Sequence, residues 1–199
     1  EISISVSADV ELRQGNTSKV ILEGDEDDLD NIETKVRGDK LVIKSKRSFN
    51  FGWNDRVKIY ITAKKIEEID ISGSADIKGK SKISSNEIEL NVSGSGEIHL
   101  PELESSTIEA SISGSGKIEL GGSKTARDLE VDISGSGKMD AEQLSVESGD
   151  IEISGSGRCR VNVSNSLEAD ISGSGRVYYK GNPNINANIS GSGKVRSID

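Results

Sequence analysis

The chain has 199 residues and a net charge of −9, with 34 acidic and 25 basic side chains. Such an acidic chain repels nucleic acid and anionic membrane surfaces, which argues against both as partners. Only 32% of the residues are hydrophobic and 3% are aromatic, so a core has to be built from aliphatic side chains. With Cys159 as the single cysteine and His99 as the single histidine, the sequence excludes an intrachain disulfide and a zinc site.

Two features of the sequence bear on the location of the protein: the length of its apolar runs and its first residue. No run approaches the ~20 apolar residues that a membrane-spanning helix needs, so we expect no membrane insertion. The sequence begins at Glu1 rather than at a methionine. We therefore expect that an N-terminal segment, best interpreted as a secretion signal, is removed, and that the protein is exported to the periplasm, the outer membrane or the cell surface.

Residues 1–66 carry alternating apolar and polar runs, among them "EISISV", "KVILEG", "KLVIKS" and "VKIYITA". Period-two alternation is typical of strands with one buried face. Arg37, Gly38 and Asp39 separate two of these runs and predict a tight hairpin turn. Residues 23–31 read as an acidic loop. We predict an antiparallel segment, residues 1–66, that caps or extends the structure formed by residues 67–199. The pattern leaves open whether its strands are separate or form early coils.

Half of the aromatic residues lie close together in this segment. Phe49, Phe51 and Trp53 are spaced by two, which places them on one face of a strand. They are expected to close the end of the fold, or alternatively to form a sugar-stacking or partner-binding patch. Tyr178 and Tyr179 lie near the C-terminus, and we expect one of them to face outward. We assign Tyr178 to the same candidate binding surface as the three clustered aromatic residues.

From residue 67 onward the chain repeats one phrase, Ser-Gly-Ser-Gly, written "SGSA" in its first copy. The copies begin at Ser72, Ser93, Ser113, Ser134, Ser154, Ser172 and Ser190. The steps between them are 21, 20, 21, 20, 18 and 18 residues, and such even spacing indicates a solenoid. The patterns of leucine-rich repeats and of calcium-binding nonapeptide repeats are absent.

The residues around each phrase alternate in step with it. The position before the phrase is occupied by Ile71, Val92, Ile112, Ile133, Ile153, Ile171 and Ile189. Apolar residues also stand two positions earlier, and again five positions after the first serine. This pattern predicts an all-β fold, a parallel β-helix of about seven coils stacked ~4.8 Å apart. Within "ISGSG" the alternation predicts that the isoleucine and both glycines point inward and that the serines form outward columns.

The same spacing predicts columns of charge if the coils stack in register. Four residues before the phrases stand Glu68, Glu89, Glu109, Glu130, Asp150 and Glu168, with Asn186 in the last repeat. This row is interpreted as a solvated acidic face, or alternatively as a ridge that collects calcium or docks a basic partner. Four residues after the first serine stand Lys117, Lys138, Arg158, Arg176 and Lys194, which predict a basic row.

Taken together, a β-rich start, an "I-x-x-I-D-I-S-G-S-A-D-I" stretch at residues 66–77 and the serial "I-S-G-S-G-x-I" coils resemble the putative auto-transporter adhesin family with a head GIN domain. That resemblance implies a bacterial, exported or cell-surface β-helical protein with a role in adhesion. It supplies no catalytic, cofactor or binding residues that can be carried over to this chain.

Three functions fit these observations. The first is a non-enzymatic exported scaffold or adhesin-like module that binds a glycan or a protein. The second is a carbohydrate-active β-helix enzyme, which would need a cleft with converging acidic and basic side chains. The third is a structural polymer that self-associates through its C-terminal coil. No catalytic residue, resident metal or cofactor is predicted.

Overall fold

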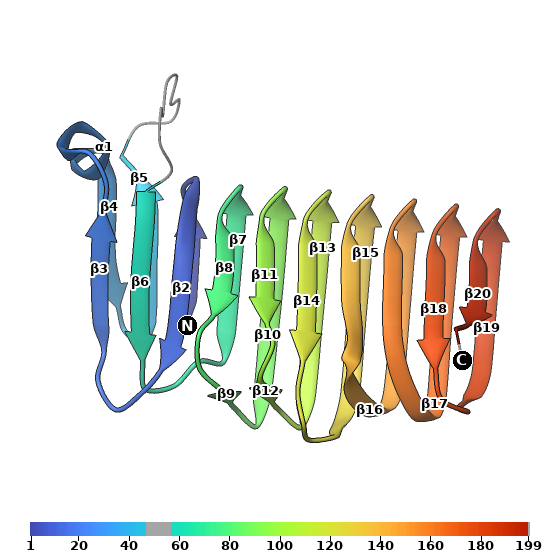
Figure 1. Cartoon of the computed structure of the whole chain (residues 1–199). Coiled ribbons are helices and arrows are strands. Elements are labelled where there is room, and N and C mark those ends of the chain that lie inside the picture. Colours follow the sequence, from blue (N-terminus) through green and yellow to red (C-terminus); the bar gives the residue numbers. More distant parts are fainter. Residues whose placement is uncertain (47–56, 199) are drawn as a thin grey trace.

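The computed structural model describes residues 1–46 and 57–198. The chain folds into a β-solenoid whose coils stand side by side from the β3–β6 end to the β19–β20 end (Figure 1). The predicted parallel β-helix is confirmed, with a coil count close to the expected one. Most strands belong to one 18-stranded sheet that wraps around the coils, and a two-stranded sheet lies at one corner.

Each repeat contributes one strand before its phrase and one after it. The strands that precede the phrases stack in the order β7 (Glu68–Gly73), β10 (Glu87–Gly94), β13 (Thr107–Gly114), β15 (Ala126–Gly135), the second halves of β16 (Lys138–Gly155) and β17 (Arg158–Gly173), and β19 (Asn184–Gly191). The strands that follow them stack in the order β8 (Asp76–Gly79), β11 (Glu97–Leu100), β14 (Lys117–Gly121), the first halves of β16 and β17, β18 (Arg176–Lys180) and β20 (Lys194–Ser197). The corner sheet pairs β9 (Ile83–Ser84) with β12 (Leu103–Glu104).

The N-terminal segment is part of the solenoid, and its chain order differs from its stacking order. Strand β1 (Ile2–Ser5) pairs in parallel with β5 (Lys40–Ser45) and β7, and β2 (Ala8–Gln14) pairs in parallel with β6 (Val57–Ala63) and β8. Among the described strands, only β3 (Lys19–Glu23), beside β6, and β4 (Ile32–Arg37), beside β5, pair antiparallel. The expectation of antiparallel strands is therefore wrong for β1 and β2, which form an early coil. The boundary at residue 66 stays a prediction.

The first coil is a degenerate copy of the repeat. Its register pairs Ile4 with Ile71 and Asp9 with Asp76, so "ISVSADV" at residues 4–10 stacks on "ISGSADI" at residues 71–77. Val6 replaces the first glycine of the phrase. The Ser-Gly-Ser-Gly pattern therefore does not identify this copy. The coil formed by β5 and β6 stacks outside it, although it comes later in the chain.

Two local predictions in this segment have different outcomes. The hairpin turn is confirmed, because Arg37 pairs with Lys40 and Gly38 has a φ of 61°. The acidic loop is wrong in part, because residues 26–30 form the short helix α1 (Glu26–Asp30). Its first turn carries Glu26, Asp27 and Asp28, and negative charge at a helix N-terminus is favourable to the helix dipole.

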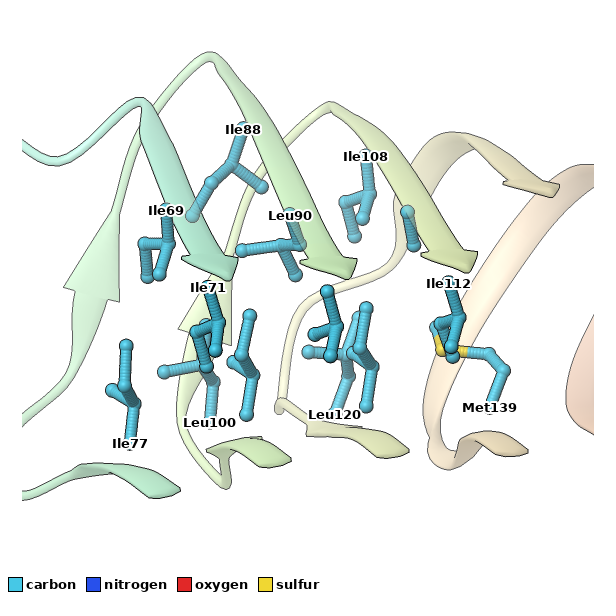
Figure 2. Packing of buried hydrophobic residues seen from close by; sticks show 14 of the residues in the cluster. Ile69, Ile71, Ile77, Ile88, Leu90, Leu100, Ile108, Ile112, Leu120 and Met139 are labelled. Carbon is cyan, nitrogen blue, oxygen red and sulfur yellow. The ribbon is translucent and has the colours of Figure 1, made fainter. Parts of the chain in front are cut away.

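The interior is filled by columns of aliphatic side chains, as the alternation predicts. In the column that starts at Ile69 and Leu90, every residue up to Ala169 is at most 2% exposed. Figure 2 shows Ile71, Leu90 and Ile112 pointing into the space between the strands, with equivalent residues of successive coils next to one another. All buried side chains among the described residues are apolar.

The two glycines of each phrase have different roles, which corrects the prediction that both point inward. The first glycine is at the turn, is at least partly exposed, and has a φ between 113° and 122° in all seven copies. This left-handed region favours glycine. The second glycine, which is replaced by Ala75 in the first copy, is buried in every copy except the last, where Gly193 is partly exposed. A Cβ on Gly157 would lie 2.5 Å from Cγ2 of Ile133, so the isoleucine of a neighbouring coil occupies the space of the missing side chain.

Backbone hydrogen bonds continue through this turn from coil to coil. The N–H of Ser136 donates to the carbonyl of Gly114 at 2.8 Å, and the N–H of Ser156 donates to that of Gly135 at 2.7 Å. After the second glycine, Arg158 N–H donates to the Gly137 carbonyl at 3.0 Å. The ladder therefore has no gap at the phrase, and it fixes the register of every coil against the next.

The close contact of the second glycine gives a direct prediction. Gly157→Ala should lower the free energy of unfolding by about 1–3 kcal/mol, because the new methyl group overlaps a β-branched side chain that is itself packed in a column. Ser156→Ala, one residue away and exposed, should change it by less than about 0.5 kcal/mol. Urea denaturation measures both, and equal losses from the two variants would contradict the assignment of Gly157 to the interior.

Candidate functional site

The outer faces of the two stacked strand sets carry columns of opposite charge. On the strands that precede the phrases, register pairing joins Glu68 to Glu89 and continues without a break to Glu168. Beside this column runs a second one that contains Asp70, Asp132, Glu152 and Asp170. We call the two columns together the acidic ridge. The in-register stacking on which the calcium hypothesis depends is therefore present.

Basic and amide groups compensate the ridge at its two ends. Lys40 Nζ lies 2.7 Å from both Glu68 Oε1 and Asp70 Oδ2, which raises the pKa of Lys40. Although burial alone would raise the pKa of Asp70, the hydrogen bonds from Lys40 and Asn91 outweigh it and the net shift is downward. At the other end, Asn188 Nδ2 donates to Asp170 Oδ1 at 2.8 Å.

In the middle of the ridge, around Glu130 and Glu152, the described part of the chain supplies no such compensating group. Partial burial and the charges of Glu109, Asp132 and Asp150 raise the pKa of Glu130. The pKa of Glu152 is also raised, chiefly by the charge of Asp132. Like charges directly opposite each other on neighbouring strands destabilise a sheet, so the central ridge is a source of electrostatic repulsion.

The ridge does not gather its carboxylates around one point. Within residues 1–46 and 57–198, no group of three or more His, Cys, Asp or Glu side chains is arranged to hold a metal ion. Carboxylates in one column point away from the sheet side by side, whereas a calcium site needs six to eight oxygen ligands around the ion. Calcium binding by Glu68, Glu89, Glu109, Glu130, Asp150 and Glu168 stays a prediction that this geometry does not favour.

The opposite face carries the predicted basic row, also in register. We call its exposed part, Lys138, Arg158, Arg176 and Lys194, the basic column. Lys117 continues the row toward the N-terminus, but it is paired with Glu119 at 2.6 Å. The four residues of the basic column form no ion pair with any acidic side chain in the described part of the chain.

Two further columns flank the basic column. On the side of the turn lie exposed serines of the phrases, among them Ser136, Ser156 and Ser174. On the other side, Arg160 stacks over the ring of Tyr178, with its guanidinium carbon 5.9 Å from the ring centroid. The structure thus places Tyr178 on the outer face, while Tyr179 packs against the core.

A shallow hollow of about 560 Å³ lies where β11 and β14 meet the corner sheet. His99, Glu104, Glu119 and Asp140 are among the residues that line it. His99 Nδ1 lies 3.6 Å from Glu119 Oε2 and has no hydrogen-bond partner within residues 1–46 and 57–198. No motif in the sequence marks this hollow, because it arises where His99, Glu119 and Asp140 of successive coils meet a corner of irregular length.

Lys117 makes Glu119 a poor proton donor. The hydrogen bond from Lys117 lowers the pKa of Glu119, and the nearby His99 acts in the same direction. Glu119 is therefore an ionised carboxylate at neutral pH. A glycosidase acid needs the opposite shift, toward a raised pKa.

The aromatic cluster and the C-terminal coil are the two other surfaces that the sequence predicts. Phe49, Phe51 and Trp53 lie outside the described residues. On β19, Ile185 and Ile189 are each 44% exposed, so apolar side chains are accessible on the last coil. Self-association through this coil stays a prediction.

The comparison with protein families decides the classification. The family model described as "Putative auto-transporter adhesin, head GIN domain" matches residues 1–183. The chain belongs to this family. The resemblance drawn from the serial phrases is therefore confirmed, and membership in an adhesin family agrees with an exported or surface location. No helix in the described residues is long and apolar enough to cross a membrane.

Solved structures of similar proteins share the solenoid over nearly their full length. A "putative adhesin" from Bacteroides fragilis NCTC 9343 is 21% identical, with a TM-score of 0.93 over 99% of this chain and 91% of that one. A "putative lipid binding protein" from Parabacteroides distasonis ATCC 8503 is 26% identical, with a TM-score of 0.80 over 100% and 92%. A "putative adhesin" from Parabacteroides merdae ATCC 43184 is 21% identical, with a TM-score of 0.78 over 100% and 91%. No curated protein matches the chain.

The repulsion in the acidic ridge gives a testable prediction for a head GIN domain of this kind. Glu130→Gln should stabilise the protein at neutral pH and low salt, by a few tenths of a kcal/mol up to about 1 kcal/mol, because it removes one of several stacked charges. The gain should shrink with added sodium chloride, which screens the neighbouring carboxylates. It should also shrink as the pH falls from neutral to about 5, because the raised pKa lets Glu130 itself take up a proton.

Glu142→Gln is the matched control on the other face. Glu142 is paired with Lys180 and with Arg160, whose Nη1 lies 3.3 Å from Glu142 Oε2, and its pKa is lowered mainly by the hydrogen bond from Lys180. The same substitution should therefore lower the melting temperature slightly. Thermal melts at low and high salt measure both variants. A stability change of the same sign in both would contradict the assignment of repulsion to the ridge.

Proposed function

We propose that the protein is a non-enzymatic, exported adhesin-like module that binds a glycan or a protein ligand with the exposed columns of its solenoid. The observation that carries this proposal is the repetition of the same exposed side chains from coil to coil, in a register held by the backbone ladder. Such a surface offers a ligand several equivalent contacts on a rigid support.

Multiple equivalent contacts suit adhesion better than they suit catalysis. A long ligand loses its translational and rotational entropy when it binds the first coil. Each contact with a further coil therefore adds affinity at a smaller entropic cost. A catalytic centre instead needs a few groups of different character that converge on one point. The columns of this chain supply repetition, and membership in the head GIN domain family supports the same role.

The hollow around His99 is the observation that favours a second candidate, a carbohydrate-active enzyme. It brings a histidine and several acidic side chains together, and glycoside cleavage uses a pair of acidic side chains. The lowered pKa of Glu119 weighs against this candidate, because general acid catalysis of glycoside cleavage needs a protonated carboxyl group.

Binding of the labelled protein to a glycan array and to whole bacterial cells tests the proposal. We expect saturable binding to at least one glycan class or cell surface, competition by unlabelled protein, and no release of shortened glycan. The variant His99→Gln with Glu119→Gln should bind as the wild type does. Absence of saturable binding in every arm would overturn the proposal, and glycan cleavage that is lost in this variant would replace it with the enzyme.

A further inference from the structure

The basic column differs from the other basic side chains of this acidic chain. Elsewhere the cations are commonly held by acids: Lys40 bridges Glu68 and Asp70, and Lys82 and Lys124 lie 3.1 and 3.0 Å from Glu104. In contrast, the basic column places four cations in register on four successive coils with no anionic partner among the described residues. The ladder holds these like charges beside one another at the sheet spacing of ~4.8 Å.

We propose that the basic column binds a linear acidic polysaccharide that lies along the solenoid axis. This inference rests on the proposed function and names its ligand class. The sheet spacing is close to the length of one sugar ring in an extended polysaccharide, so carboxylates or sulfates on a chain of sugars can meet the cations of successive coils. Arg158 and Arg176 can grip such groups with two parallel N–H donors each.

The flanking columns fit the other parts of a sugar chain. The exposed hydroxyls of Ser156 and Ser174 lie on the turn side of Arg158 and Arg176, where they can exchange hydrogen bonds with sugar hydroxyls. Tyr178, on the other side, offers an aromatic face, although Arg160 already stacks over it. Along each of these coils, a cation is thus accompanied by a hydroxyl group or an aromatic ring.

Single-stranded nucleic acid is a different polyanion, and the geometry disfavours it. Proteins that bind it without sequence preference present aromatic platforms on which successive bases stack. Beside the basic column, the described residues supply one ring, that of the half-buried Tyr178, where the equivalent positions on neighbouring coils are Arg160 and Arg196. The net charge of −9 repels every polyanion, so the discrimination between a nucleic acid and an acidic polysaccharide rests on the aromatic platforms.

Titration calorimetry with two acidic probes, oligogalacturonate and heparin oligosaccharide, tests the inference, with dextran as the neutral probe and oligo(dT) as the nucleic acid probe. We expect the wild type to bind at least one acidic probe, with a dissociation constant that rises with sodium chloride, and to bind neither dextran nor oligo(dT) comparably. Arg158→Gln combined with Arg176→Gln should weaken this binding about fivefold to tenfold.

Lys19→Gln combined with Lys64→Gln is the matched control, because both lysines are exposed, lie at the other end of the solenoid, and change the net charge by the same amount. This control should bind the acidic probe as the wild type does. Thermal melts should confirm that both double variants remain folded.

Equal weakening in the two double variants, or an unchanged affinity in the Arg158 and Arg176 variant, would overturn the inference. Tighter binding of oligo(dT) than of both acidic probes would overturn it as well. If the wild type and both variants bind cells or a neutral glycan equally, the adhesin-like function stands and the basic column is not its site. If the wild type binds nothing in any arm, the proposed function fails together with the inference.

Discussion

The hydrogen-bond ladder through the glycine turns is the constraint on which the rest of the structure depends. From Ser95 onward, each coil donates from the serine N–H after its turn glycine to the carbonyl of the turn glycine in the coil before it, for example from Ser174 to Gly155 at 2.8 Å. A side chain on the turn glycine would collide with the same carbonyl, since a Cβ on Gly173 would lie 2.6 Å from the Gly155 oxygen. The phrase is repeated because two different positions, one at the turn and one in the interior, leave no room for a side chain.

Register then determines the surface as well as the core. Because the coils stack in register, the residues at each outward position form a column. Where these residues carry the same charge, the fold holds them next to one another even though they repel. Neighbouring carboxylates ~4.8 Å apart repel by about 0.9 kcal/mol per pair at the dielectric of water. Burial of a single leucine or isoleucine contributes about 1.5–3 kcal/mol, and every coil buries several such residues. The core therefore outweighs the repulsion, and the fold tolerates unpaired columns of charge on its surface.

The alternation around each phrase was sufficient to predict the stacked coils, the inward columns and both charged rows, because in a solenoid a spacing along the chain becomes a neighbour relation in space. It was not sufficient where the pattern lost its glycines. The coil at residues 4–10 has Val6 at the turn position. The coil formed by β5 and β6 stacks outside it, although β5 and β6 come later in the chain. The hollow around His99 also escaped prediction, because its depth depends on how coils of different lengths meet at the corner and not on any motif.

Disulfide trapping of stacked serines tests the central claim of in-register stacking most directly. Strands of a sheet lie 4.7–4.9 Å apart, within the Cα separation of about 4.4–6.8 Å that a disulfide spans, whereas an offset of two residues places the pair beyond it. Ser113 pairs with Ser134 and Ser111 pairs with Asp132. Under mild oxidation, the double variant Ser113→Cys with Ser134→Cys should form an intramolecular disulfide readily, whereas Ser113→Cys with Asp132→Cys should form little. Efficient cross-linking of the offset pair and not of the aligned pair would contradict the register.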